Sequence, residues 1–202
     1  MSLNHFLHIF FPIYLATYFC LCLLSRTLIV WRKIKTNPLG LGKKGGIYDF
    51  IWASLWGILT LEVSSVFIFV FSQDLYHYLG PVAYLDTPTL QKMGVFLMLT
   101  SMFWVFTGQA QMGNSWRIGI DQKNKTELVR TGFYRFSRNP IFLGILVSAL
   151  GVFLTLPNLI TFFVMGASFL VIQMEIRLEE AHLAALHGKS YEDFCKKVRR
   201  WV

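Results

Sequence analysis

The residues best suited to chemistry lie in one short basic segment, residues 126–144, that runs directly into an apolar stretch. The segment reads TELVRTGFYRFSRNPIFLG. Asn139 and Pro140 predict the start of a helix, because Asn is a favoured N-cap and Pro is well tolerated at the first helical position. The first backbone N–H groups of such a helix lack partners and carry the positive end of its dipole, and Arg135 and Arg138 lie close by in the chain. This pattern predicts a binding site for an anionic group.

An acidic sequence, EIRLEEAHLAALHGKSYEDF, follows the apolar stretches. On a helix, Glu175 and Glu179 share one face, and Glu180 is expected to turn away from it. We expect Glu179 to lie opposite Asn139, since both mark the end of an apolar segment. Two interpretations remain open. The carboxylate could form part of a ligand site, or it could form an ion pair with an Arg that closes a helical hairpin, which contributes little where it is exposed.

The elements that must position these residues are apolar helices. The chain is 54% hydrophobic and 15% charged, with a mean hydropathy of +0.50, as expected of a protein whose solvent is largely lipid. Five apolar stretches lie near residues 6–24, 48–71, 90–108, 140–156 and 158–175. Most approach the roughly 20 residues that a membrane-spanning helix needs. We therefore predict an all-α integral membrane protein with about five transmembrane helices, the last two forming a hairpin at Pro157 and Asn158.

The distribution of charge predicts the orientation. A net charge of +8 is compatible with nucleic acid or with a membrane surface, and the positions of the cations decide for the membrane. Six Lys and Arg residues lie in each of the segments 26–44, 109–139 and 177–200, and only Lys92 lies elsewhere. With five spans these three segments share one side, which the positive-inside rule makes cytoplasmic. We expect an outside N-terminus, a cytoplasmic C-terminus and site, most simply in a bacterial inner membrane, and no nucleic acid partner.

The C-terminal segment from Ser190 has apolar residues at spacings of three and four with basic residues between them, the pattern of an amphipathic helix. Such a helix could lie in the membrane interface or pack on the protein's own loops. We interpret residues 1–202 as a single membrane domain, with three spans in residues 1–110 and the loop, hairpin and tail in residues 111–202. His182 and His187 lack further ligands at metal spacing, so we expect no metal.

The motif residues have a characteristic spacing across the C-terminal part of the chain. They are Leu128, Val129, Gly132, Tyr134, Arg138, Asn139, Pro140, Phe142, Gly144, Glu179, Glu180, Leu183, Gly188 and Tyr191. This pattern resembles the isoprenylcysteine carboxyl methyltransferase and phospholipid methyltransferase superfamily, whereas the first three spans match it in hydropathy only. The resemblance implies an integral membrane enzyme that binds S-adenosylmethionine on the cytoplasmic side and methylates a lipidic or hydrophobic acceptor that partitions into the membrane. The expected partners are this small-molecule acceptor and membrane lipid.

The resemblance also implies roles for particular residues. The catalytic residues would be Arg138 and Glu179. The residues that bind the cofactor would be Leu128, Val129, Gly132, Tyr134, Arg138, Asn139, Pro140, Phe142, Glu179 and Glu180. The whole of the segments 126–129 and 139–142 is expected to touch it. The helix start and Arg138 suit the α-carboxylate of S-adenosylmethionine, and a carboxylate such as Glu179 suits its ammonium and ribose hydroxyls. Tyr134 and Phe142 are aromatic faces for the sulfonium cation.

Two features separate this chain from its nearest alternatives. Prenylcysteine enzymes carry an Arg one turn before the first Glu of the acidic pair, and this chain has Glu175 there, which argues against a prenylcysteine carboxylate as acceptor. The related sterol reductases, which bind NADPH, usually place an acidic residue after the Gly that matches Gly144, and here Ile145 follows. A methyltransferase is therefore favoured over a reductase. A membrane binding protein without catalysis is the alternative from another class.

Overall fold

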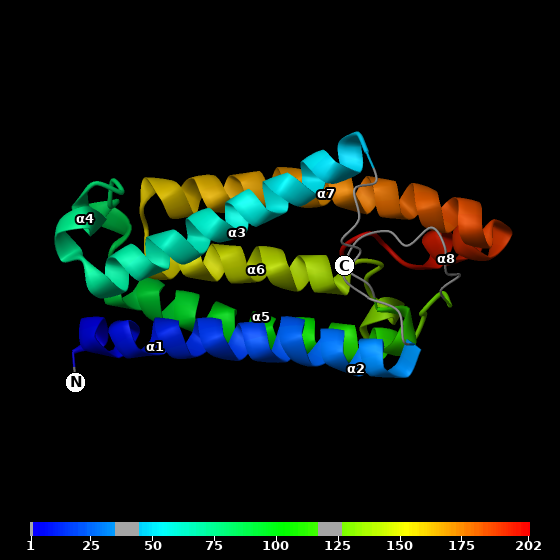
Figure 1. Ribbon diagram of the computed structural model, residues 1–202, viewed down its shortest axis with the longest axis horizontal. Helices are drawn as coiled ribbons and strands as arrows, with labels where there is room; N and C mark the ends of the chain where they lie inside the picture. Colours follow the sequence, from blue (N-terminus) through cyan, green and yellow to red (C-terminus); the bar gives the residue numbers. More distant parts are fainter. Residues whose placement is uncertain (1, 35–44, 117–126) are drawn as a thin grey trace.

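The computed structural model, which describes residues 2–34, 45–116 and 127–202, consists of long helices running in alternating directions (Figure 1). The elements are α1 Leu3–Tyr18, η1 Phe19–Ser25, α2 Arg26–Ile34, α3 Ile47–Phe71, α4 Gln73–His77, η2 Ala83–Leu85, α5 Pro88–Met112, η3 Gly113–Ser115, η4 Gly132–Arg135, α6 Pro140–Thr155, α7 Leu159–His187 and α8 Lys189–Lys197. No strand occurs in these three described ranges. The predicted all-α membrane class is confirmed.

Four helices are long and apolar enough to cross a membrane. The first is a continuous rod, Leu3–Lys33, in which α1, the π-helical turn η1 and α2 follow one another without a break; the others are α3, α5 and α7. The fifth predicted span, α6, is also apolar but has 16 residues, about 24 Å of helix. It lies between α5 and α7, where its neighbours cover it (Figure 1).

Helices α5 and α6 approach each other closely because glycines face each other across their contact. A Cβ atom added to Gly151 of α6 would lie 2.8 Å from Met98 Cγ and 2.9 Å from the carbonyl oxygen of Gly94 on α5. A backbone oxygen cannot move aside as a flexible side chain can. Gly144 is equally close to α5, since its added Cβ would meet the side chain of Val105. The start of α6, which carries the motif, is therefore fixed in position by α5.

The turn between α6 and α7 forms the predicted hairpin. Asn158 caps α7: its side-chain oxygen accepts from the Thr161 N–H at 2.9 Å, and the Thr161 hydroxyl accepts from the Asn158 N–H at 3.2 Å. This reciprocal capping satisfies two helix-end donors. The turn also pairs with Pro81, in the connection between α4 and α5. The hairpin returns α7 to the end of the molecule where α6 begins (Figure 1).

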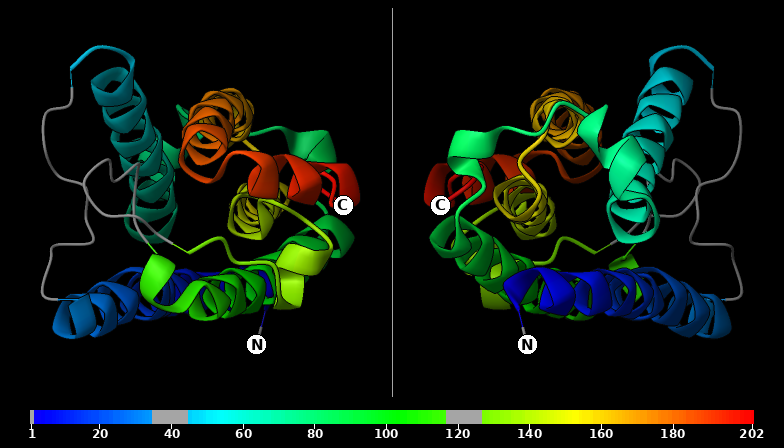
Figure 2. Two further views of the ribbon diagram at one scale, coloured as in Figure 1. Left: turned by 90° about the vertical axis from the view of Figure 1, so that its right-hand side faces the viewer. Right: turned by 90° about the vertical axis from the view of Figure 1, so that its left-hand side faces the viewer.

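The packed core lies near the other end of the molecule, and helix α3 is placed obliquely across the bundle. A cluster of buried side chains joins α1, α3, α5 and α6, formed by Leu7, Phe11, Tyr14, Val66, Phe69, Met98, Val152 and Leu156. Toward its N-terminal end α3 stays beside α7 and diverges from α2 (Figures 1 and 2). The end that carries the motif is therefore the end at which α2 and α3 lie farthest apart (Figures 1 and 2).

The C-terminal amphipathic helix is shorter than its sequence pattern predicts. Helix α8 ends at Lys197, and Val198 is already extended. The apolar side chains of Tyr191, Phe194 and Val198 are buried and pack against Leu128 and Leu183. Of the two alternatives for this face, the structure shows packing on the protein's own loop and on α7.

Candidate functional site

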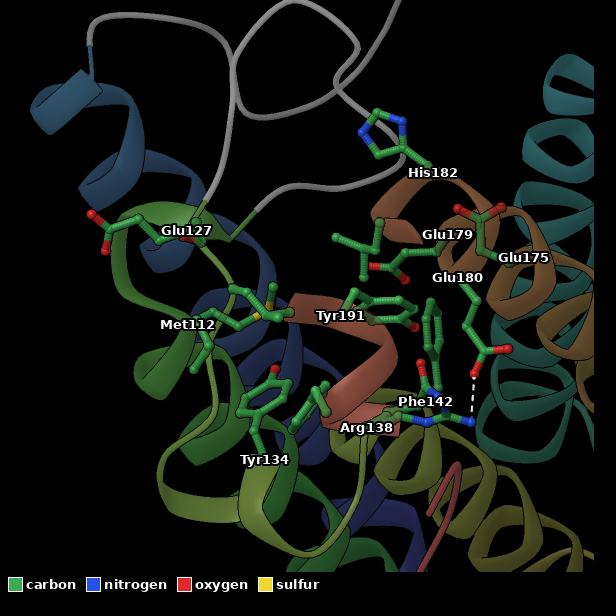
Figure 3. Close-up of a pocket in the computed structure, with 16 residues that line it drawn as sticks. Met112, Glu127, Tyr134, Arg138, Phe142, Glu175, Glu179, Glu180, His182 and Tyr191 are labelled. Atoms are coloured by element: carbon green, nitrogen blue, oxygen red, sulfur yellow. Dashed lines mark ion pairs between the residues drawn. The ribbon is translucent and has the colours of Figure 1, made fainter. Parts of the chain in front are cut away.

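A pocket lies where residues 127–139 pass α7 and α8 (Figure 3). Eight of the predicted cofactor residues line it: Leu128, Val129, Tyr134, Arg138, Asn139, Phe142, Glu179 and Glu180. Met112 and Tyr134 stand on one side of the pocket and Glu179 and His182 on the other (Figure 3). Thr126 is outside the described residues. Asn139 and Glu179, which are expected to lie opposite each other, both line this pocket.

Gly132 and Pro140 are not among the residues that line the pocket. Gly132 has φ +62°, and a Cβ there would collide with the side chain of Gln111, so the turn requires glycine. Gln111 Oε1 accepts from the Phe133 N–H at 2.7 Å, and Phe133 stacks on Trp104 with 4.0 Å between ring centroids. Trp104 Nε1 in turn donates to the Pro140 carbonyl at 2.9 Å. Both predicted ligands instead belong to the framework that holds the motif against α5.

Glu180 does not turn away from the site, so this prediction from the helical face is wrong. Its Oε1 lies 3.1 Å from Arg138 Nη2, and it also binds Arg200 with a bidentate geometry, at 3.1 Å to Nε and 2.6 Å to Nη2. Glu179 and Glu180 both line the pocket. The Glu to Arg ion pair considered as an alternative for Glu179 is formed by Glu180 instead.

Asn139 is at the start of α6, as predicted, but its side chain does not cap the helix. Its Nδ2 donates to the Arg200 carbonyl at 3.2 Å, and its own N–H donates to Ser137 Oγ at 3.1 Å. The Arg138 N–H donates to the Arg199 carbonyl at 3.0 Å. The last residues of the chain thus hold the motif by its backbone, and the Asn139 side chain leaves the first N–H groups of α6 uncapped.

The residues before the turn are held against α8. Arg130 donates from Nη2 to the Ser190 carbonyl at 2.9 Å and to the Ser190 hydroxyl, and its guanidinium lies 5.9 Å from the centroid of the Phe194 ring. Leu128 packs on the buried face of α8. These contacts place Leu128 and Val129 in the pocket wall opposite the start of α6.

Tyr134 is buried in the pocket wall with 6% exposure. Its hydroxyl donates to the Gly108 carbonyl at 3.4 Å. Burial raises the pKa of Tyr134 far above its usual value, and the nearby Glu179 carboxylate raises it further. The hydroxyl is therefore neutral at physiological pH and acts as a hydrogen-bond donor, while the ring presents an apolar surface.

A larger apolar cavity of about 690 Å³ adjoins the polar pocket. Side chains of α1, η1, α3, α5, α6 and α7 line it, among them Trp52, Val63 and Ile145. Four residues belong to both spaces: Met112, Phe142, Glu175 and Glu179. A polar ligand and an apolar ligand bound in the two spaces would meet at this shared wall.

The sequence did not identify every residue of the pocket wall. Met112 and Ser115 carry no motif signal. Glu127 belongs to the segment 126–129 that the resemblance implies for the cofactor, Tyr191 belongs to the motif, and Phe194 lies on the amphipathic face of the C-terminal segment. Glu175, His182 and Leu183 could be found, since they lie at helical spacing around Glu179. Among the described residues no group of three or more His, Cys, Asp or Glu gathers as a metal site would require.

These features define a membrane protein of apolar helices in which a polar pocket, built from the motif, opens onto an apolar cavity. The sequence profile of the phospholipid methyltransferase family matches residues 90–190, from α5 to the start of α8. The chain belongs to this family, which confirms the resemblance. It is also 32% identical over 95 residues to a protein-S-isoprenylcysteine O-methyltransferase of Schizosaccharomyces pombe. That match covers 46% of this chain and 40% of the relative.

Proposed function

We propose that the protein transfers a methyl group from S-adenosylmethionine to a lipidic acceptor at the cytoplasmic face of a membrane. The observation that supports this most directly is the shared wall of Met112, Phe142, Glu175 and Glu179 between the polar pocket and the apolar cavity. A transferase that joins a polar donor to an apolar acceptor needs adjoining spaces of these two kinds. Family membership supports the same reaction class.

The residues of the polar pocket have the chemistry that S-adenosylmethionine requires. Arg138 lines the pocket, and its Nε is buried without a hydrogen-bond partner in the described structure. This donor and the uncapped start of α6 suit the α-carboxylate. Glu179 suits the ammonium or the ribose hydroxyls, and Leu128, Val129 and Leu183 offer an apolar wall for the adenine. The pocket measures about 120 Å³, less than most small-molecule sites, so we expect binding to widen it.

The bound cofactor would supply an activated methyl group on a sulfonium cation. The contribution of the chain is then to position the reactants and to exclude water, which accounts for much of the acceleration in an in-line displacement. Phe142 and Tyr134 present aromatic surfaces that attract a cation. Glu179 stands at the shared wall, where the cation and the acceptor would meet. We assign no obligatory general base.

The arrangement of the helices supports a cytoplasmic site. The described parts of the three cation-rich segments lie at the end of the molecule where α2, α5 and α7 finish and where the pocket is found (Figure 1). The opposite end carries α4, with Asp74 in its first turn. By the positive-inside rule, this distribution of charge supports a cytoplasmic position for the end with the pocket.

Calorimetric titration of the detergent-solubilised protein with S-adenosylhomocysteine, and separately with NADPH, tests the proposal. We expect binding of S-adenosylhomocysteine only. Glu179→Ala and Arg138→Ala should each abolish that binding while circular dichroism shows an intact helical fold. Arg177→Ala and Glu192→Ala change exposed charges outside the pocket wall and serve as matched controls with unchanged affinity.

The other outcomes discriminate the alternatives. Binding of NADPH alone would favour a reductase of the sterol reductase type. Binding of neither compound would favour a membrane protein without this catalytic role. If S-adenosylhomocysteine binds, transfer of a radiolabelled methyl group into the organic phase of a membrane lipid extract tests the lipidic acceptor. Label that appears only in water-soluble products would contradict it.

A further inference from the structure

The last residues of the chain cross the start of α6, beside residues that line the polar pocket. The carbonyl of Arg200 accepts from Asn139 Nδ2 at 3.2 Å and from the Ser137 hydroxyl at 3.3 Å. The guanidinium of Arg200 donates to the Glu180 carboxylate, at 3.1 Å from Nε to Oε1 and at 2.6 Å from Nη2 to Oε2. Val198 is buried and anchors the segment beside α8. Arg200 is therefore held both by its backbone and by its side chain.

Glu180 is shared by two guanidinium groups, and this sharing changes the charge beside the pocket. Arg138 lies 3.1 Å from Glu180, with side chains that are 14% and 17% exposed. Alone, this pair would be electrically neutral and would offer little attraction to an anion. The second cation, Arg200, gives the cluster of three a net charge of +1. Bidentate contact of an Arg with a carboxylate is the strongest form of such pairing, so Glu180 has its negative charge largely satisfied by Arg200.

Two further observations indicate where this positive charge acts. Arg138 Nε is buried and has no partner in the described residues, while Arg138 also lines the pocket (Figure 3). Arg138 lies next to the start of α6, and the Asn139 side chain does not cap that helix start. A buried donor, an uncapped helix start and a net cationic cluster together suit one anionic group.

We propose that Arg200 is a positioning residue for cofactor binding, which neutralises Glu180 so that Arg138 is available to the α-carboxylate of S-adenosylmethionine. Arg200 does not line the pocket and lies outside residues 90–190, which match the family. The inference rests on the proposed function, since it specifies which part of that cofactor the cluster binds. Arg200 acts through Glu180 and Arg138 and touches no reacting atom.

The test compares two ligands that differ in the carboxylate. S-adenosylhomocysteine carries the amino-acid group, whereas 5′-methylthioadenosine keeps the adenosine and the sulfur and lacks that group. Arg200→Gln removes the charge but keeps a donor for Glu180, and Arg200→Lys keeps the charge. We expect Arg200→Gln to weaken S-adenosylhomocysteine binding roughly tenfold, as loss of one nearby charge near a protein surface implies, and Arg200→Lys to weaken it less than about threefold. Binding of 5′-methylthioadenosine should be unchanged in both.

Arg199→Gln is the matched control, because Arg199 is the neighbouring residue, its side chain is exposed, and the substitution removes the same charge. The affinities of the Arg199→Gln variant for S-adenosylhomocysteine and for 5′-methylthioadenosine should equal those of the unsubstituted protein. If Arg200→Gln weakens both ligands equally, or if it weakens neither, the inference is overturned while the proposed function stands. If the unsubstituted protein binds neither ligand, both the inference and the proposed function are overturned.

Discussion

Removal of the Glu180 carboxylate should destabilise the protein, because it leaves two guanidinium groups next to each other without their common partner. At the observed 3.1 Å between Arg138 Nη2 and Glu180 Oε1, the Coulomb energy is about 5 kcal/mol for an effective dielectric constant near 20. Desolvation offsets much of this, and deletion of one partner costs about 3–5 kcal/mol for a buried pair but below about 1 kcal/mol for an exposed one. The pair is mostly buried, so we expect Glu180→Ala to lower the free energy of unfolding by about 2 kcal/mol.

The free energy that the bidentate Arg200 contact contributes to stability is reduced by solvent screening, since the Arg200 side chain is 35% exposed, and it is not added to this figure. For a chain of this size about 2 kcal/mol corresponds to a decrease in Tm of about 4–8 °C. Thermal unfolding followed by circular dichroism in one detergent, at one protein concentration, measures the change. Glu192→Ala, on the exposed face of α8, is the matched control. Its free energy of unfolding should lie within about 0.5 kcal/mol of that of the unsubstituted protein. A Tm for Glu180→Ala equal to that of this control would refute the reasoning.

Three further substitutions test other parts of the structure. Gly151→Ala should cost about 1–3 kcal/mol by overpacking, because its Cβ would lie 2.9 Å from a backbone oxygen of α5; Gly166→Ala on α7 meets nothing within 4 Å and should leave Tm unchanged or higher. Gly132→Ala forces a side chain into a left-handed conformation at about 1 kcal/mol, so both Tm and the affinity for S-adenosylhomocysteine should fall. Val63→Trp fills the apolar cavity and should lower methyl transfer to lipid without changing the affinity for S-adenosylhomocysteine. Leu61→Trp, on the exposed side of α3, is the control and should change neither methyl transfer nor affinity.

The helices and the hairpin could be predicted from sequence because their signals are local. Apolar length identifies a membrane helix, and Pro157 with Asn158 marks a turn whatever surrounds it. The start of α6 at Pro140 was found for the same reason, since Pro is tolerated at that position and disfavoured later in a helix. These elements depend on residues within a few positions of each other.

The partners in the site could not be predicted because they come from distant parts of the chain. Glu180 was expected to face away from the motif, and only the path of the C-terminal segment brings Arg200 to it. Asn is a residue type favoured at the N-cap, yet the Asn139 side chain donates to the Arg200 carbonyl and does not cap α6. The apolar face of α8 is compatible with lipid or with protein, and hydrophobicity alone does not distinguish the two.

The shortness of α6 has a consequence for how deep the reaction would take place. A helix of 16 residues covers about 24 Å, whereas the hydrocarbon layer measures about 30 Å. With the α6–α7 turn at the far surface, Pro140 would stop about 6 Å short of the near one, inside the leaflet. A lipid could then present its head group by sinking or tilting slightly, and the protein would not have to extract it from the bilayer.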